Sequence, residues 1–330
     1  MVFSQQATSN KQQATSNKQQ ARSVFPLVFT RSITLISVLS SVSLAPLSAE
    51  GNGAFMEGGF QYSNFGGVTE TSNGASTETY NGSTTVLSPA SGSLQKLNGN
   101  LYGADIQAGY KQFFGKTKRF GLRYYGFFSG QGGSALYQQQ KYNNSDGEAY
   151  NTVIHQPAAN LFYGVGIDAL LNFYDKNNST FGVFAGVMIG GSSWLMGKGR
   201  QDGQCAWATA LNNQGNPTNC VTMNDYYDQQ AKMNNELAAI SGNPTGSKAS
   251  FSPNYVQFIF NVGFRANLSK HQGFEVGVRI PTIDDPYYTF TMPSTTGSNN
   301  GGVSFTTGAY KETLTLRRNI AVYLNYVINF

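Results

Sequence analysis

The side chains that most often carry enzyme chemistry are few in this sequence and stand far apart. The chain has two histidines, His155 and His271, and neither has a serine or acid at a spacing that predicts a catalytic triad. Asp284 and Asp285 form an acidic pair, which suits a solvated turn or a weak cation site better than a catalytic dyad. We therefore predict that the protein is not an enzyme and holds no metal or cofactor.

Charged residues are also scarce, at 12% of the chain against roughly 25% in typical globular domains. Seven of them occupy the polar positions of segments in which polar and apolar residues alternate: Glu57, Asp105, Arg123, Asp168, Arg265, Glu275 and Arg279. Charges of both signs on one buried face must pair with one another. These residues therefore predict a salt-bridge network that fills an interior, or, as the alternative, a narrow polar conduit.

The segments that position these charges read as strands, because apolar residues recur in them with a period of two. In the last one, Ile320, Val322, Leu324, Tyr326 and Phe330 alternate with smaller or more polar residues. We predict eight strands, at 54–63, 101–114, 119–129, 161–173, 180–193, 254–268, 273–280 and 317–330. The β-prone segments 287–292 and 303–316 either extend the last two strands or add a further pair, which would make ten.

The connections between these strands alternate in length. They are short at 115–118, 174–179 and 269–272, and long at 64–100, 130–160, 194–253 and 281–316, with a short helix expected over 226–240. About 9–11 tilted residues cross a membrane as a strand. Short periplasmic turns and long extracellular loops are typical of an outer-membrane barrel. The sequence predicts an all-β fold, a transmembrane antiparallel β-barrel over 50–330.

The first 49 residues have the character of a secretory leader. Basic residues precede a short apolar run, and a small-residue site predicts cleavage between Ala49 and Glu50. A polar heptapeptide at 5–11 is repeated at 12–18. Removing the four basic residues of this segment from the total of 22 leaves 18 against 17 acidic residues, so the mature chain is nearly neutral. That balance argues against nucleic-acid binding.

The connection 194–253 is the predicted partner-facing surface. It holds Trp194, Trp207, Tyr226 and Tyr227 in a polar background, which suits the binding of carbohydrate or protein. The alternative is an ordinary loop folded over the barrel mouth, with Trp194 anchored at the membrane interface. The same connection holds Cys205 and Cys220, and an even cysteine count in an exported chain predicts a disulfide worth roughly 3 kcal/mol.

The leader, the Gly/Tyr/Phe-rich strands, the Asn/Gly/Gln/Thr-rich loops and the terminal strand from Arg317 to Phe330 together resemble the Helicobacter outer-membrane protein superfamily. That superfamily includes adhesins and porins. The resemblance implies residence in the outer membrane. The large adhesins carry a long extracellular head before the barrel, whereas here the first two predicted strands are separated only by the connection 64–100.

We therefore expect a barrel whose surface loops serve adhesion or host interaction, with a porin-like channel for small solutes as the alternative. The expected partners are the lipid bilayer of the outer membrane and a host-cell glycan or protein. By resemblance to other such barrels, Phe330 is expected to be the signal that the barrel-assembly machinery reads.

Overall fold

The computed structural model describes residues 51–115, 117–142, 149–176, 179–210, 218–240, 246–299 and 301–330. These residues belong to one compact unit, Ser48–Phe330. The predicted leader and its cleavage position between Ala49 and Glu50 lie outside the described residues. No helix in the described ranges is long and apolar enough to cross a membrane.

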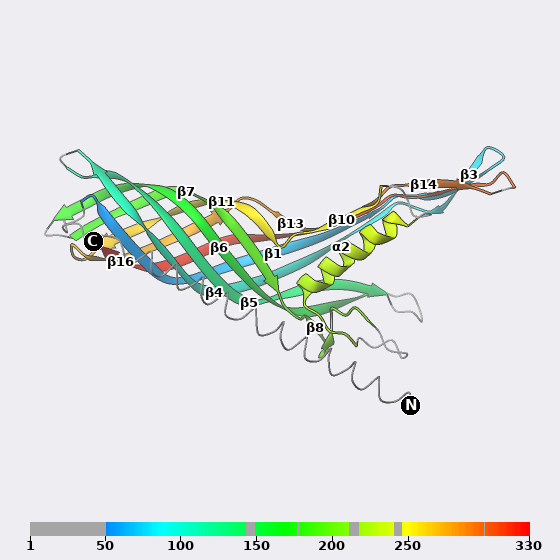
Figure 1. Ribbon diagram of the computed structural model, residues 1–330, viewed down its shortest axis with the longest axis horizontal. Coiled ribbons are helices and arrows are strands. Elements are labelled where there is room, and N and C mark those ends of the chain that lie inside the picture. The colour runs from blue at the N-terminus through cyan, green and yellow to red at the C-terminus, as the bar shows by residue number, and fades with distance from the viewer. Residues whose placement is uncertain are drawn as a thin grey trace, which may run out of the picture. The chain divides into compact units, whose positions relative to one another are not determined.

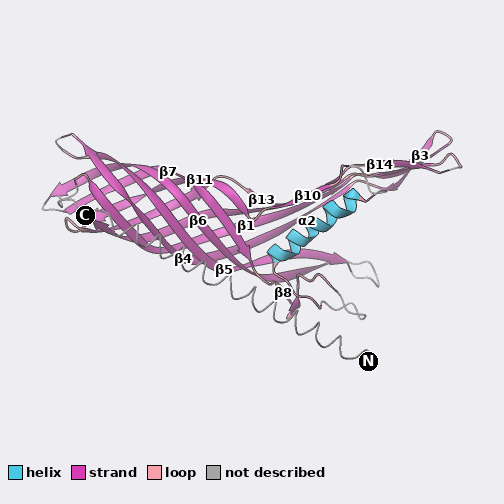
Figure 2. Cartoon of the chain, in the orientation of Figure 1, coloured by secondary structure: helices cyan, strands magenta, loops and turns pink. Residues whose placement is uncertain are grey.

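In the described part of the chain, eight long strands form a closed antiparallel ring (Figure 1, Figure 2). Pairing of β1 with β16, from Phe55 opposite Asn329 to Asn73 opposite Tyr310, closes the ring. This confirms the predicted eight-stranded barrel, and the ten-stranded alternative is wrong. In ring order the strands are β1 (Gly53–Asn73), β4 (Ser91–Phe114), β5 (Phe120–Tyr142), β6 (Ala149–Lys176), β7 (Ser179–Met196), β11 (Asn254–Asn267), β12 (Gln272–Pro281) and β16 (Tyr310–Asn329).

Alternation along the strands separates a lipid-facing surface from a lumen. On β16, the outward residues from Ile320 to Ile328 are 38–51% exposed, whereas Ala321 and Tyr323 between them are at most 1% exposed. Outward apolar residues such as Tyr102 on β4 and Phe264 on β11 continue the same surface around the ring. We call this surface the apolar belt, and it is the part of the barrel that faces the bilayer.

The two ends of the barrel differ as predicted. At the end that holds Phe330, the connection 115–119 joins β4 to β5, and the connection 268–271 joins β11 to β12. Gly115 takes a positive φ of 73° at the start of the first of these turns. The long connections leave the opposite end. The short turns are periplasmic and the long connections extracellular.

Much of the sequence expected to be extracellular loop is strand instead. The connections predicted at 64–100 and 130–160 are shorter, because β1 continues to Asn73, β4 starts at Ser91, β5 continues to Tyr142 and β6 starts at Ala149. These stretches are rich in Gly, Ser, Thr, Gln and Asn, so they lack an alternating apolar face. Pairing with the neighbouring strands, rather than sequence pattern, extends them past the belt.

Short strands accompany these extensions. The first half of β16 pairs with β13 (Asp285–Met292), which in turn pairs with β10 (Lys248–Phe251). A separate sheet has the order β14 (Thr295–Ser298), β15 (Ser304–Thr307), β2 (Ser76–Tyr80), β3 (Ser83–Ser88). The segment 287–292 and the part of 303–316 that belongs to β16 therefore extend the barrel wall, whereas 304–307 belongs to the separate sheet, and neither segment adds a membrane-spanning pair. β8 (Arg200–Gln201) and β9 (Gln204–Cys205) form a short hairpin beside β6.

The helix expected over 226–240 is present as α2 (Met223–Ala239). Thr222 begins it, because its hydroxyl oxygen accepts a 3.0 Å hydrogen bond from the Asp225 N–H. Met223, Tyr227 and Ala231, spaced four residues apart, form its buried face. The helix runs alongside β10 and β13 (Figure 1) and closes one side of the extracellular end.

Candidate functional site

An ion cluster centred on Arg123 of β5 occupies the lumen. Its Nε lies 2.8 Å from a carboxylate oxygen of Asp168, and its Nη1 lies 2.7 Å from Glu275 and 3.3 Å from Glu57. The four side chains are at most 2% exposed. Nε of Arg265 lies 3.7 Å from Glu275 and brings a second cation to the cluster. Buried charges persist only when they are paired in this way.

A second ion pair lies beside this cluster. Nη2 of Arg279 on β12 lies 2.6 Å from a carboxylate oxygen of Asp105 on β4, and its Nη1 donates a hydrogen bond to the side chain of Gln61 on β1. The same guanidinium lies 4.1 Å from the ring centre of Tyr323. The structure thus places all seven predicted lumen residues inside the barrel and joins them into ion pairs.

Aromatic and amide side chains fill the space around these charges. The Tyr323 hydroxyl donates to Asn261 Oδ1 at 2.9 Å, and Asn261 Nδ2 donates to the Tyr125 hydroxyl at 3.2 Å. Phe127 and Phe162 pack with ring centres 4.5 Å apart. The interior of an eight-stranded barrel is just wide enough for side chains to fill, and here large ones fill it.

The lumen holds two further cations, Lys111 and Arg318, which are not among the seven predicted residues. Lys111 donates from Nζ to Asn329 Oδ1 at 2.7 Å; its position, in step with Asp105, was the signal that could have identified it. The Arg318 guanidinium lies 4.8 Å from the Phe162 ring centre. No simple alternation predicts this position, because a β-bulge at Asn319 shifts the register of β16.

At the extracellular end, α2 and the extended wall enclose a cavity of about 330 Å³, which we call the aromatic chamber. Three predicted binding residues, Trp207, Tyr226 and Tyr227, line it. Further lining rings and polar groups come from β1, β4, β5, β13, β16 and the helix itself: Thr69, Thr71, Gln95, Tyr137, Gln139, Gln230, Asn234, Tyr288, Phe290, Tyr310 and Glu312.

The polar groups of the aromatic chamber are oriented by hydrogen bonds. Tyr137 donates to Gln95 Oε1 at 3.0 Å, and Asn234 Nδ2 donates to the Tyr288 hydroxyl at 3.1 Å. The Tyr310 hydroxyl donates to Glu312 Oε2 at 3.1 Å. Burial raises the pKa of Glu312, and the Tyr310 hydrogen bond opposes that rise. Glu312 is the one carboxylate among the chamber's lining residues.

The predicted disulfide between Cys205 and Cys220 is confirmed. It ties the hairpin β8–β9 to the segment that leads into α2, next to the isolated bridge between Ala208 and Cys220. Trp207 lies between these attachments, and its Nε1 donates to Gln156 Oε1 of β6 at 2.6 Å. The disulfide therefore holds Trp207 against the barrel wall.

The exposure expected of the four aromatic candidates was largely wrong. Trp194 is fully buried and packs on Phe65, with ring centres 5.1 Å apart, so it neither faces a partner nor anchors at the membrane interface. Trp207 and Tyr227 are each only 5% exposed and form the floor of the aromatic chamber, while Tyr226 is half-buried at its side.

Residues 105–330 match the family model described as Helicobacter outer membrane protein. The chain belongs to this family. It is an outer-membrane protein, and the bilayer is therefore the environment of its apolar belt. No curated protein matches it.

Solved outer-membrane proteins are similar to this family member at low identity. OprG from Pseudomonas aeruginosa is 12% identical, with a TM-score of 0.33, and the match covers 86% of this chain and 99% of OprG. The outer membrane protease OmpT from Escherichia coli is 8% identical, with a TM-score of 0.33, and the match covers 88% of this chain and 100% of OmpT. Ail, the attachment invasion locus protein of Yersinia pestis, is 8% identical, with a TM-score of 0.22, and the match covers 77% of this chain and 98% of Ail.

The two histidines and the acidic pair that the sequence analysis considers for catalysis or cation binding are widely separated in this outer-membrane protein. His271 Nδ1 lies 3.2 Å from the Asn329 carbonyl oxygen at the periplasmic rim, whereas His155 pairs with Arg200 at the extracellular end. The acidic pair is also divided, because Asp284 is exposed and Asp285 is buried. Within the described residues, no three His, Cys, Asp or Glu side chains are grouped as metal ligands.

Proposed function

We propose that this outer-membrane barrel displays a ligand-binding surface and does not conduct solutes. The observation that carries the proposal is the Arg123 cluster, whose four side chains are at most 2% exposed and in which Arg123 contacts all three carboxyl groups. A conducting lumen needs hydrated polar groups along a continuous path. The close contacts among these buried side chains support a lumen without such a path.

The aromatic chamber supports the binding role. Sugars present apolar C–H faces and hydroxyl edges, and pockets for such ligands combine aromatic surface with a few placed polar groups. Tyr226, Tyr288 and Tyr310 supply rings, while Gln230, Asn234 and Glu312 supply donors and acceptors. We propose that this chamber takes one sugar residue of a host-cell glycan, which would serve adhesion. The proposed role is binding without catalysis.

Conductance measurement tests the closed lumen. Protein refolded into a planar bilayer should give no steady current, whereas a variant that replaces Arg123 and Glu275 with alanine should leak because it empties the lumen centre. Steady single-channel steps from the unaltered protein would contradict the proposal and favour the porin-like alternative for small solutes.

Glycan binding to whole cells tests the chamber. Tyr310→Ala and Glu312→Gln should each lower binding on a glycan array or attachment to epithelial cells. Tyr80→Ala is the matched control, because Tyr80 of β2 is 52% exposed and does not line the chamber. Equal attachment by all three variants, at equal surface levels, would exclude the chamber as the binding site.

A further inference from the structure

The outward face of β4, β1 and β16 changes character in regular rows as it leaves the bilayer. Tyr62 of β1, with Tyr102 and Val322 as its pairing partners, forms the last aromatic row of the apolar belt. The two tyrosine rings lie 5.3 Å apart. Tyrosines in such positions mark the membrane interface.

The next row consists of amides. Asn64 Nδ2 donates to the Asn100 side-chain oxygen at 3.2 Å, and Asn319 Nδ2 donates to the Asn64 side-chain oxygen at 2.7 Å. The Tyr62 hydroxyl also donates to Asn100 Oδ1, at 2.8 Å. Asn319 reaches this outer face because it is the extra residue of the β-bulge in β16, where Asn64 pairs with Ile320 and Phe65 pairs with Arg318.

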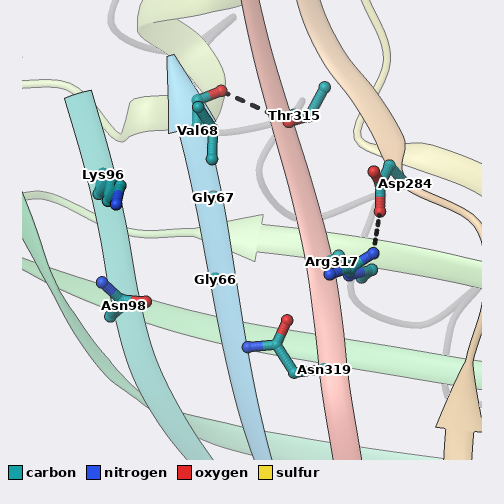
Figure 3. Close-up of a pocket in the computed structure, with 9 residues that line it drawn as sticks. All are labelled: Gly66, Gly67, Val68, Lys96, Asn98, Asp284, Thr315, Arg317 and Asn319. Atoms are coloured by element: carbon teal, nitrogen blue, oxygen red, sulfur yellow. Dashed lines mark hydrogen bonds and ion pairs between the residues drawn. The ribbon is translucent and has the colours of Figure 1, made fainter. Parts of the chain in front are cut away.

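Two cations follow the amide row. Gly66 pairs with Asn98 on one side and Arg317 on the other, and Val68 pairs with Lys96 and Thr315. These residues surround a hollow of about 170 Å³, which we call the basic hollow. In Figure 3, Lys96 and Asn98 stand on one strand, Arg317 and Asn319 on another, and glycines lie between them.

The floor of the basic hollow is open because Gly66 has no side chain. A Cβ built there would meet the Leu97 carbonyl oxygen at 3.4 Å and the Asn319 and Asn98 amides at 3.5 Å, which is ordinary contact. Asp284 lies 3.2 Å from Arg317 Nη1, and both side chains are about half exposed. An exposed pair of this kind is weak, so Arg317 can turn to another anion at little cost.

The level of the basic hollow relative to the bilayer identifies its surroundings. Successive outward residues on a strand are about 7 Å apart, and barrel strands tilt by about 45°. Each row therefore rises about 5 Å above the one before. The Asn98–Gly66–Arg317 row lies two rows above the tyrosines, which places the hollow among the lipid headgroups of the outer leaflet.

We propose that the basic hollow binds a phosphate group carried by a lipid of the outer leaflet. The Arg317 guanidinium and the Lys96 ammonium provide charge-assisted donors, the amides of Asn98 and Asn319 provide neutral ones, and the space above Gly66 admits the phosphate. The acyl chains of the lipid lie against the apolar belt below. This binding site is on the outer wall, away from the lumen and the aromatic chamber.

Lipid retention tests the proposal on the full-length protein in nanodiscs. The probe is bisphosphorylated lipid A in a zwitterionic lipid background, with dephosphorylated lipid A as the comparison, and bound lipid is counted by native mass spectrometry. Removing one cation near a membrane surface costs roughly a fivefold loss of affinity. We expect Lys96→Gln with Arg317→Gln to reduce retention about thirtyfold, and Asp284→Asn to increase it.

Two further variants separate the site from general charge. Gly66→Leu fills the hollow without changing charge and should also reduce retention strongly. Lys311→Gln removes an exposed cation from β16, the strand of Arg317, at a position farther from the bilayer. It should leave retention unchanged. Equal losses in Lys311→Gln, or full retention in the double variant, would overturn the proposal. Displacement of lipid A by millimolar inorganic phosphate would assign the site to free phosphate instead and would also overturn it.

Discussion

The guanidinium of Arg123 contacts the carboxylate of Glu275 at 2.7 Å, although β5 and β12 stand four strand steps apart in either direction around the ring. One ion pair therefore crosses the full width of the barrel. Because Arg123 also contacts Glu57 and Asp168, a single side chain connects β1, β5, β6 and β12.

Replacing Arg123 with methionine is predicted to destabilise the barrel strongly. The variant keeps apolar volume but leaves Glu57, Asp168 and Glu275 close together without their shared cation. Breaking a buried pair in this way costs about 3–5 kcal/mol. Urea unfolding of the refolded protein in vesicles, followed by tryptophan fluorescence, measures the loss. Adding Glu57→Gln and Glu275→Gln should restore part of it.

The control for that experiment is Lys232→Met, which removes an exposed i,i+4 pair with Asp228 on α2. Exposed pairs contribute about 0.3–0.5 kcal/mol. If Arg123→Met costs no more than this control, the cluster does not stabilise the fold.

Removing the disulfide with Cys205→Ser and Cys220→Ser should act on the aromatic chamber and spare the barrel. The bond closes a segment that holds Trp207, and Trp207 contributes to the chamber floor. We expect Trp207 fluorescence to shift to longer wavelength as its ring gains water, with the heat resistance of the barrel on gels unchanged. Trp194→Phe isolates the Trp207 signal. An unchanged spectrum would show that the chamber holds its shape without the bond.

The buried carboxylate of Asp285 predicts a pH dependence of stability. It has no hydrogen-bond partner among the described residues, and burial raises its pKa from 3.8 to about 7. Between these values the folded protein binds more protons than the unfolded chain, so the free energy of unfolding falls as pH rises from about 4 to 7. Asp285→Asn should flatten this slope and stabilise the protein above pH 7.

The exposed neighbour provides the matched control for this titration. Asp284→Asn removes the adjacent carboxylate and should keep the slope of the unaltered protein. Urea midpoints measured from pH 4.5 to 8 compare the three proteins. Parallel curves for Asp285→Asn and the unaltered protein would contradict the assignment.

Deletion of Phe330 should impair assembly. Its N–H donates to the Ala54 carbonyl oxygen at 2.9 Å, and its ring is 40% exposed at the periplasmic rim, where an assembly factor can reach it. We expect less heat-resistant, surface-exposed protein, with export to the periplasm intact. Phe330→Tyr keeps the aromatic ring and should behave as the unaltered chain does. Normal surface levels after deletion would remove the proposed role as the signal for the barrel-assembly machinery.

The membrane-spanning part could be predicted from sequence because lipid and lumen impose opposite demands on alternate residues. Val322 and Tyr323 illustrate this on β16: Val322 is 43% exposed and Tyr323 is 1% exposed. The same alternation identified Asp105, Arg123 and Asp168 as interior. Beyond the belt the outward face meets water instead of lipid and becomes polar, while the inward face is apolar only at scattered positions such as Phe65 and Leu97, so the sequence pattern weakens. For that reason the sequence predicts a loop at 64–73, although this segment continues β1.

Register shifts set a second limit on prediction. Counting alternate residues back from Ile320 would turn Arg318 toward lipid, but the bulge at Asn319 turns it inward and sends Arg317 outward. One inserted residue therefore exchanges the environments of two neighbouring arginines. The sequence also predicts exposed positions for Asp285 and Trp194, because their local sequence resembles a loop. Pairing with β16 buries Asp285, and packing on Phe65 of β1 buries Trp194.

The closing seam imposes an order of events on folding. Phe55 pairs with Asn329, so one edge of β1, whose other edge pairs with β4, stays unpaired until β16 has been made and exported. Contacts this distant in sequence form slowly, since a long loop must close first. Throughout that interval two strand edges carry unpaired N–H and C=O groups, which would attract any other extended chain. The vulnerable period of this protein's life is therefore its transit through the periplasm, before β16 meets β1.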